Sequence, residues 1–464
     1  MPEHNHQLRA AREATASPRI PGACLSRQEL AEAVNAWLAV NTTRRGALDE
    51  NYIGRLEQGR VRWPGRDYRA AFRAVLGVVS DTALGFRPSH RRPVRPLPGG
   101  SAEPEGYGGA LPLSLTDQWT AERAAELGYA VRASAELPIT ADIAPRLVHE
   151  WLVVEPPQTV ERTAGRRVGA SLADTVTRRV KQLRHLDDFV AGGDLHPAVE
   201  RELRVTAGLV REGSYTDAVG RQLLTAVGEL CQLAGWATAD AGQHRNAGRY
   251  YTAGIGAAHA AGDRPLAGNL ISTLAYHTAN TGDPRDAVLL GQSALAGSRD
   301  AASATTRALF GERVAWAHAK TGDRRATERA LGQVEDRYAQ RQPADDPEWV
   351  YWLTADEIDV MAGRCWTELG EPDRAQPLLL RALADYGEQY TRELALYTSW
   401  LAETYVQQGD VDAAAILAGR VLELSARTAS ARSDDRVRHL RRLLAPHQDS
   451  AAVRELEERY RALR

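Results

Sequence analysis

Five glycines that recur at near-regular intervals constrain the fold of this chain more than any other feature. Their separations are 40, 40, 48 and 39 residues, and each lies between two segments with helical periodicity. A small residue precedes each glycine by seven positions, and another follows it by five. Small side chains at both positions allow two antiparallel helices to pack closely across a tight glycine turn. The glycines are Gly242, Gly282, Gly322, Gly370 and Gly409; the preceding small residues are Gly235, Ala275, Ala315, Gly363 and Ala402, and the following ones are Ala247, Ala287, Thr327, Ala375 and Ala414.

This pattern resembles the tetratricopeptide repeat, in which helix pairs stack side by side into a solenoid. The resemblance covers roughly residues 207–424, and a further repeat would turn at Gly213 and Ala218. The period is near 40 residues rather than the 34 of that family, a difference that longer helices would explain. The resemblance implies an α-solenoid with a concave groove lined by the first helix of each pair.

Composition divides the rest of the chain. Residues 1–86 have the periodicity of a compact helical unit, and residues 87–112 are rich in Pro, Gly and Arg, as expected for a linker. We expect a helical connector at 113–206, the repeats at 207–429, and helices that cap the last repeat or form a dimer interface at 430–464. No convincing strand pattern is present, although residues 146–154 form a short ambiguous apolar run. The sequence therefore predicts an all-α protein.

The net charge of −2 hides a strong asymmetry. Residues 1–95 contain 16 arginines and nine acidic residues, a charge of +7, whereas residues 96–464 contain 42 basic and 51 acidic residues, a charge of −9. A basic first segment on an acidic body is the distribution expected when that segment binds a polyanion. No apolar run approaches twenty residues, the N-terminus lacks the apolar core of a signal peptide, and three cysteines lie far apart. We therefore expect a cytoplasmic protein without a membrane segment.

Two short motifs in the basic segment predict a pair of helices. The first helix begins with a capping box formed by Ser26 and Glu29, and the second begins near Asp49. These motifs resemble the Xre/Cro-type helix-turn-helix family. The matching residues are Gln28, Leu30 and Ala31 in the first helix, and Ile53, Glu57 and Gly59 in the second.

The resemblance implies that the second helix enters the DNA major groove and that Gln28 contacts phosphate. Residues 36–47 form an insertion at the turn, which would lengthen the first helix and present two arginines to the DNA backbone. Arginines after the second helix suit further phosphate contacts. The predicted DNA-binding residues are Gln28, Arg44, Arg45, Glu50, Asn51, Tyr52, Arg55, Arg60 and Arg62.

The tetratricopeptide resemblance also implies which residues face the groove. The position six before each glycine carries Trp236, Tyr276, Trp316, Arg364 and Glu403. Aromatic rings bordered by carboxylates suit a ligand with an apolar body and amine groups, or a peptide; alternatively, these rings pack between adjacent repeats. The predicted ligand-binding residues are Trp236, Asn269, Tyr276, Asn280, Glu312, Trp316, Lys320, Glu357 and Arg364.

The joined resemblances imply a function. Regulators that combine an Xre-type domain with tetratricopeptide repeats include peptide-sensing quorum regulators, and many actinobacterial regulators share this layout. Lys181 and Lys320 are the only lysines, and the excess of arginine and alanine indicates a GC-rich genome. We therefore expect a homodimeric, sequence-specific transcription regulator of double-stranded DNA that responds to a peptide or small molecule.

Enzymatic activity is not expected. The sequence contains no Walker loop, Gly-x-Ser-x-Gly, His-Glu-x-x-His or Cys-x-x-Cys motif, and it predicts no cofactor or metal site. A second function class stays open, namely an adaptor whose repeats bind a partner protein. The basic charge of residues 1–95 favours the regulator.

Overall fold

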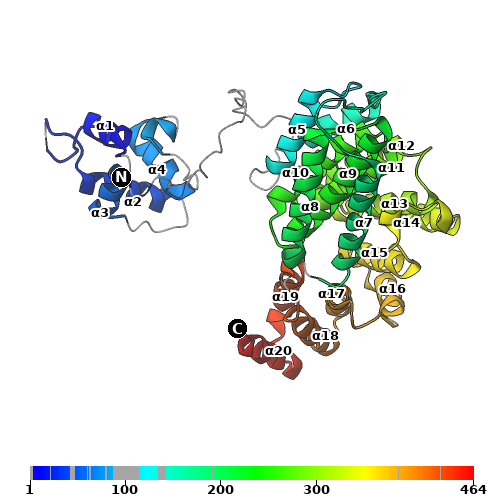
Figure 1. The fold of residues 1–464 in the computed structure, drawn as a ribbon. Coiled ribbons are helices and arrows are strands. Elements are labelled where there is room, and N and C mark those ends of the chain that lie inside the picture. The colour runs from blue at the N-terminus through cyan, green and yellow to red at the C-terminus, as the bar shows by residue number, and fades with distance from the viewer. Residues whose placement is uncertain are drawn as a thin grey trace. The chain divides into compact units, whose positions relative to one another are not determined.

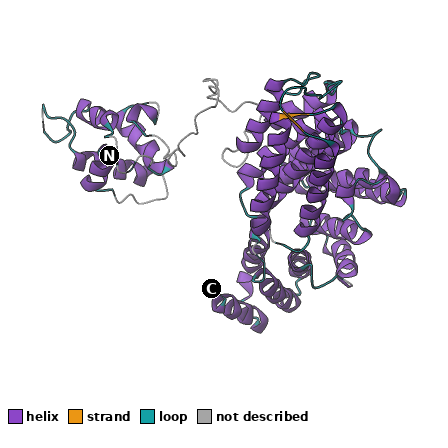
Figure 2. Cartoon of the chain, in the orientation of Figure 1, coloured by secondary structure: helices purple, strands orange, loops and turns teal. Residues whose placement is uncertain are grey.

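A computed structural model describes residues 4–20, 22–41, 48–59, 61, 64–78, 81–86, 114–133, 143–190, 192–384, 386–428 and 430–463. These residues contain twenty α-helices and two short strands, so the predicted all-α class is confirmed (Figure 2). They form two compact units, Met1–Gly106 and Tyr107–Arg464. The predicted linker at 87–112 lies outside the described residues.

The smaller unit has one hydrophobic core. Its helices are α1 (His6–Ala14), α2 (Arg27–Asn41), α3 (Glu50–Glu57), α4 (Arg66–Leu76) and the 3₁₀ turn η1 (Thr82–Leu84). The predicted capping box begins α2, because the Glu29 amide donates to Ser26 Oγ (3.2 Å) and the Ser26 amide donates to Glu29 Oε2 (2.8 Å). The fully buried core side chains include Leu8, Leu30, Leu38, Ile53, Leu56, Phe72 and Phe86.

The predicted insertion lies between α2 and α3. Helix α2 continues to Asn41, so it is lengthened as expected, and residues 42–47 are outside the described part of the chain. Asn35 holds the two helices together because its amide donates to the Leu48 carbonyl (2.9 Å) and its Oδ1 accepts from the Leu48 amide (3.0 Å). The entry to α3 is therefore anchored on α2 whatever the length of the connection.

The larger unit begins with helices that precede the glycine pattern. These are α5 (Ala121–Ala133), α6 (Ile143–Val153), α7 (Ala170–Asp187) and α8 (Gly192–Glu212), and the ambiguous apolar run at 146–154 is thus largely helical. Two-residue strands β1 (Arg166–Arg167) and β2 (Gly213–Ser214) pair in parallel. Helix α8 and part of α7 share a core with the helices that follow.

Five helix pairs follow, and each turns at one of the predicted glycines. The pairs are α9 (Asp217–Asp240) with α10 (His244–Ala261), α11 (Arg264–Thr281) with α12 (Pro284–Gly297), α13 (Ala304–Lys320) with α14 (Arg324–Ala339), α15 (Ala355–Glu368) with α16 (Pro372–Ala384), and α17 (Thr391–Gln408) with α18 (Val411–Ser425). The short 3₁₀ turns η2 (Pro343–Asp345) and η3 (Glu348–Val350) lie between α14 and α15. The helix-pair pattern expected from the glycine spacing is present.

The small residues on either side of each glycine lie where the helices of a pair cross. All ten positions are buried. A Cβ atom built on Gly235 of α9 would lie 2.4 Å from the Tyr251 ring of α10, and one on Gly363 of α15 would lie 2.6 Å from Leu379 of α16. The helices therefore approach more closely than a larger side chain would permit.

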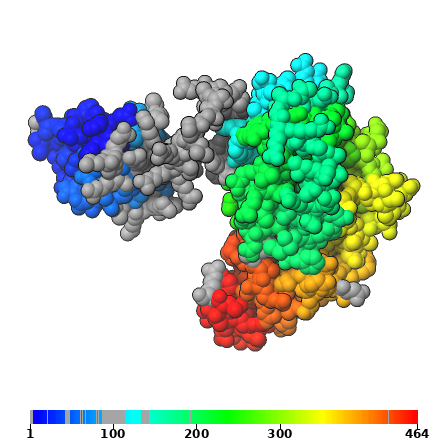
Figure 3. All heavy atoms as spheres, viewed as in Figure 1, coloured from blue at the N-terminus to red at the C-terminus, as the bar shows by residue number. Residues whose placement is uncertain are grey.

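The pairs stack in sequence order. The first helix of each pair contacts the first helix of the next, from α9 through α17, and α17 contacts α19 (Ala431–Leu444). The colour order in Figures 1 and 3 follows this succession through green, yellow, orange and red within the larger unit. One surface of the stack is thus made by the first helices.

The last two helices cover the end of the stack. Helix α19 is followed by the 3₁₀ turn η4 (Ala445–His447) and by α20 (Ala451–Ala462). The segment 430–464, expected to cap the last repeat or form a dimer interface, buries apolar side chains within this chain, because Leu440, Leu444, Val453 and Leu456 pack in a core with α17 and α18. These side chains cap the stack. No helix among the described residues is both long and apolar enough to cross a bilayer.

The close crossing at Gly235 generates a stability prediction. Gly235→Ala introduces a Cβ against the buried Tyr251 ring, and we expect the resulting strain to lower the free energy of unfolding by about 1–3 kcal/mol. The control is Gly332→Ala in α14, where the added Cβ meets nothing within 4 Å, and this variant should gain about 0.5–1 kcal/mol of helix stability. Urea unfolding monitored by tryptophan fluorescence measures both. Equal effects of the two changes would contradict the packing assigned to Gly235.

Candidate functional site

Helix α3 of the smaller unit presents a polar face. Glu50, Asn51 and Arg55 are exposed, whereas Ile53 and Leu56 are buried in the core. Tyr52 is half-buried, and the Arg55 guanidinium lies 5.3 Å from its ring centroid. The predicted recognition residues of α3 therefore share the solvent-exposed side of one helix.

Of the other predicted DNA contacts, one is described. Gln28 is exposed in the first turn of α2 and donates to Glu32 Oε1 at 3.1 Å. Arg44, Arg45, Arg60 and Arg62 lie outside the described residues.

A buried carboxylate holds α3 in place. Glu57, matched only as part of the family motif, accepts from Arg12 Nε of α1 (2.7 Å) and from Arg27 Nε of α2 (2.8 Å). Glu57 is 4% exposed and Arg12 7%. Its two partners lie 45 and 30 residues away, so no local pattern indicates the pairing. Glu57 thus ties three helices together beneath the polar face of α3.

The larger unit contains a cavity of about 740 Å³. Its walls come from the first helices of the pairs, from the end of α7, from residues 349–352 and from the start of α19. The aromatic residues that line it are Trp236, Tyr251, Tyr276, Trp349, Tyr351, Trp352, Tyr386, Tyr390, Tyr397 and Trp400.

The structure brings seven of the nine predicted ligand residues to this cavity, namely Trp236, Asn269, Tyr276, Asn280, Glu312, Glu357 and Arg364. The other two do not line it. Trp316 is 1% exposed, and its Nε1 donates to Asn280 Oδ1 (3.2 Å), so it packs between repeats. Lys320 forms an ion pair with Glu368 (2.8 Å).

The aromatic residues six positions before three of the glycines form a continuous series that Trp400 of α17 extends. The ring centroids of Trp236 and Tyr276 are 5.9 Å apart, those of Tyr276 and Trp316 are 6.5 Å apart, and those of Trp316 and Trp400 are 5.7 Å apart. Such separations are typical of favourable aromatic pairs. Trp236, Tyr276 and Trp316 thus lie side by side, although Trp316 contributes to the series from within the core.

Arginines of this chain already cover that aromatic series. Each of the four rings has a guanidinium within the distance of a cation–π contact. A cationic ligand would therefore have to displace an internal cation from these rings. The pairs are Arg432 on Trp236 (4.7 Å), Arg313 on Tyr276 (4.5 Å), Arg364 on Trp316 (4.7 Å) and Arg436 on Trp400 (3.8 Å).

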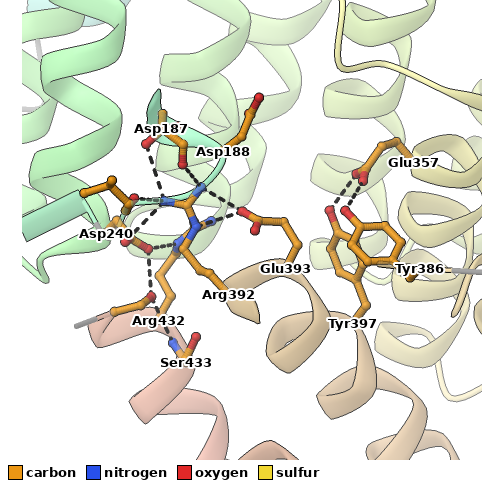
Figure 4. Close-up of polar contacts among 12 residues, drawn as sticks. Asp187, Asp188, Asp240, Glu357, Tyr386, Arg392, Glu393, Tyr397, Arg432 and Ser433 are labelled. Atoms are coloured by element: carbon orange, nitrogen blue, oxygen red, sulfur yellow. Dashed lines mark hydrogen bonds and ion pairs between the residues drawn. The ribbon is translucent and has the colours of Figure 1, made fainter. Parts of the chain in front are cut away.

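A polar network joins the two ends of the stack across the cavity (Figure 4). Arg392 of α17 donates to the Asp187 carbonyl of α7 (2.9 Å) and pairs with Glu393 (2.7 Å). Arg432 of α19 donates to Asp240 of α9 (2.6 Å). Burial would raise the pKa of Asp240, but Arg432 and Arg392 hold it below its usual range. The network therefore keeps α7 and α9 close to α17 and α19.

Two buried carboxyl groups differ in how they are satisfied. Glu357 accepts from the hydroxyl groups of Tyr386 (3.0 Å) and Tyr397 (2.6 Å), as Figure 4 shows. Glu312 is 1% exposed, and its Oε1 has no hydrogen-bond partner. Burial raises the pKa of Glu312 to about 8, against the opposing effect of Arg313. Glu312 is therefore mostly protonated at neutral pH.

Tyr276 lies at the centre of the positive charge in the cavity. Its hydroxyl accepts from Arg364 Nη2 at 2.8 Å. Burial alone would raise the pKa of Tyr276, but Arg364, Arg432 and Arg313 lower it to about 8. A lowered pKa of a tyrosine is expected where the surrounding positive charge exceeds the negative charge, because the positive charge stabilises the phenolate.

Sequence reasoning missed several cavity residues for different reasons. Arg313 could have been found, because it follows Glu312 and lies three positions before Trp316 on one helical face. Asp187, Arg392 and Arg432 carry no such signal, since they come from segments far apart in the chain.

Within the described ranges, no group of three or more His, Cys, Asp or Glu side chains is arranged to hold a metal ion. No protein-family model matches this chain, and no curated protein is similar to it. Its function is therefore inferred from the geometry of α3 and of the cavity.

The buried Glu57 pairings predict where the smaller unit is fragile. Glu57→Ala removes the buried carboxylate of Arg12 and leaves only the exposed Glu13 as its partner, and breaking a buried pair costs about 3–5 kcal/mol in comparable sites. Glu50→Ala, at an exposed position of the same helix, should change stability by less than about 0.5 kcal/mol. Hydrogen–deuterium exchange of peptides from α1 to α3 in the full chain reports both effects. Similar protection of the α1 to α3 amides in the two variants would show that the ion pairs of Glu57 do not stabilise the packing of these helices.

The raised pKa of Glu312 predicts a pH-dependent stability. Between pH 4.5 and about 8 the folded chain holds a proton on Glu312 that the unfolded chain has lost. The free energy of unfolding of the parent protein therefore falls as pH rises through this window. Glu312→Gln cannot ionise, and its stability relative to the parent protein should rise by at most about 1.4 kcal/mol per pH unit. Urea unfolding at pH 5, 6, 7 and 8 measures the difference. A constant difference would mean that Glu312 ionises normally in the folded protein.

Proposed function

We propose that this protein is a ligand-responsive, sequence-specific DNA-binding transcription regulator. The smaller unit acts as an Xre-type helix-turn-helix domain, with α3 as its recognition helix. The larger unit acts as a tetratricopeptide-like solenoid that binds a ligand in its cavity. The observation that carries the proposal is a large, aromatic-lined cavity in one unit combined with a polar, exposed helix in a second, basic unit.

Three features of the smaller unit support DNA binding. Its sequence segment carries an excess of arginine, which suits a polyanion. Helix α3 is short and its exposed side chains can donate to and accept from base edges. Glu57 and Asn35 fix α3 against its neighbours, so this face is presented on a rigid support.

Ligand binding is supported by the size and chemistry of the cavity. Its volume lies within the range of about 300–1,000 Å³ that is typical of small-molecule sites. It combines ten aromatic side chains with a larger set of polar and charged side chains, and several buried polar atoms among these, including Glu312 Oε1, have no partner. A buried polar atom without a partner is costly unless a ligand or water satisfies it.

The polar network suggests how binding is communicated. A ligand changes the conformation only if it binds two curvatures of the stack with different affinity. Because Arg392 and Arg432 connect helices from opposite ends of the stack, a ligand between these ends can favour one curvature. In a homodimer on a two-fold DNA site, this change would alter the spacing of the recognition helices. Such a role requires access to the chromosome and thus a cytoplasmic location.

Arg55 provides the direct test of DNA recognition. Sites bound by the full chain are first selected from genomic DNA, and gel-shift titrations then compare variants on the selected site and on scrambled DNA. Arg55→Ala should weaken binding to the selected site by about 1–3 kcal/mol, because a base contact is lost, with a much smaller effect on scrambled DNA. Arg9→Ala, an exposed arginine paired with Glu13 on α1, serves as the control and should bind like the parent protein.

Two outcomes would contradict the assignment. If Arg55→Ala retains full preference for the selected site, α3 does not recognise sequence through Arg55. If no genomic fragment is enriched, the smaller unit is not a sequence-specific DNA-binding domain, and the adaptor function becomes the better hypothesis.

A further inference from the structure

Two arginines in the cavity have hydrogen-bonding capacity that the protein does not use. Arg313 is 8% exposed and lies on the rings of Tyr276 (4.5 Å) and Trp352 (5.8 Å), but it forms no hydrogen bond or ion pair with the described residues. Arg364 donates only to the Tyr276 hydroxyl (2.8 Å), and its Nε is buried without a partner. A guanidinium that lies flat on a ring still presents its N–H groups at its edge.

The other arginines that line the cavity differ in this respect. Arg184 pairs with Glu229, Arg392 with Asp187 and Glu393, Arg432 with Asp240, and Arg436 with Glu403. Their charges are neutralised by the protein itself. Arg313 and Arg364 have no carboxylate in such contact among the described residues.

Two cavity carboxyl groups, Glu312 and Glu357, make no direct contact with these two guanidiniums. Glu312 forms no ion pair with Arg313 or Arg364, its Oε1 has no partner, and burial raises its pKa to about 8. Glu357 accepts from two tyrosine hydroxyls and makes no ion pair with Arg313 or Arg364. Buried charges are expensive to leave unpaired, so a negatively charged ligand would be strongly favoured at this position.

We infer that the cavity binds a planar organic anion, whose carboxylate or phosphate group is held by Arg313 and Arg364 while its ring system lies among the aromatic side chains. Guanidinium forks suit both head groups, because two parallel N–H groups match two oxygens. The inference rests on the proposed ligand-binding role of the cavity. It departs from the amine groups that the sequence leads us to expect on the ligand, since the cavity carboxylate Asp240 is paired with Arg432 and Glu357 is bonded to tyrosines.

A pair of fluorescent probes with the same ring skeleton tests this inference without DNA. The anion 8-anilino-1-naphthalenesulfonate and the neutral N-phenyl-1-naphthylamine are titrated separately into the full chain. Arg313→Gln and Arg364→Gln should each weaken binding of the anion at least tenfold and change binding of the neutral probe less than threefold. Arg374→Gln is the matched control, because Arg374 also lies on a tryptophan, Trp366 (3.5 Å), but does not line the cavity. It should leave both affinities within twofold.

Unlabelled competitors then identify the head group. 1-Naphthoate and 1-naphthyl phosphate should both displace the anionic probe, and the stronger competitor indicates whether a carboxylate or a phosphate fits better. 1-Naphthylmethylammonium should not displace it. Near-ultraviolet circular dichroism, which is lost when native side-chain packing is lost, verifies that each variant is folded.

Several results would overturn the inference. They are the absence of saturable binding of the anionic probe, equal losses for the anionic and neutral probes in the arginine variants, and displacement by the ammonium compound as effective as by the anions. Because no measurement involves DNA, the anion site can fail while DNA recognition through α3 stands, and the reverse also holds.

Discussion

Close packing of helices across small residues is the constraint on which the larger unit depends. Gly235 and Gly363 leave no room for a Cβ atom, and the alanines and Thr327 at the equivalent positions are fully buried. When the two helices of a pair approach this closely, the next pair can stack against them with its first helix in contact with the previous first helix. The repetition of one crossing therefore produces an extended surface from which side chains of successive pairs point into a shared space.

The cavity in that surface is dominated by arginines rather than by free aromatic faces. Each ring of the series from Trp236 to Trp400 has a guanidinium on it, and two of these four guanidiniums, those of Arg432 and Arg436, also bind a carboxylate. Internal ion pairs connect α7 and α9 with α17 and α19. The charged residues that form these pairs also line the cavity. What remains for a ligand are the groups that the protein leaves unsatisfied, among them Arg313, Arg364 and Glu312.

In the smaller unit, the main constraint is that a short helix, α3, must be held rigidly while one of its faces stays exposed. An eight-residue helix is not stable alone, so α3 depends on its buried residues Ile53 and Leu56 and on the bonds of Glu57 and Asn35. These contacts lie on the inner side of α3 or at its ends. Its outer side faces solvent, which is why exposed polar residues at Glu50, Asn51 and Arg55 are compatible with a stable fold.

The sequence alone determined the local structure of this protein. Glycine spacing and small residues located the helix pairs, and the capping box located the start of α2, because these features depend on neighbours within a few residues or across one turn. It also placed seven side chains on the cavity surface. Only the tertiary structure decided that Trp316 is buried, that α7 and α19 form cavity walls, and which carboxylate each arginine neutralises. Those outcomes depend on how far the stack curves, which brings residues about 200 positions apart into contact, as with Arg392 and Asp187. Local periodicity specifies the face of the helix on which a side chain lies. The way in which successive helix pairs stack decides which other residues that side chain contacts.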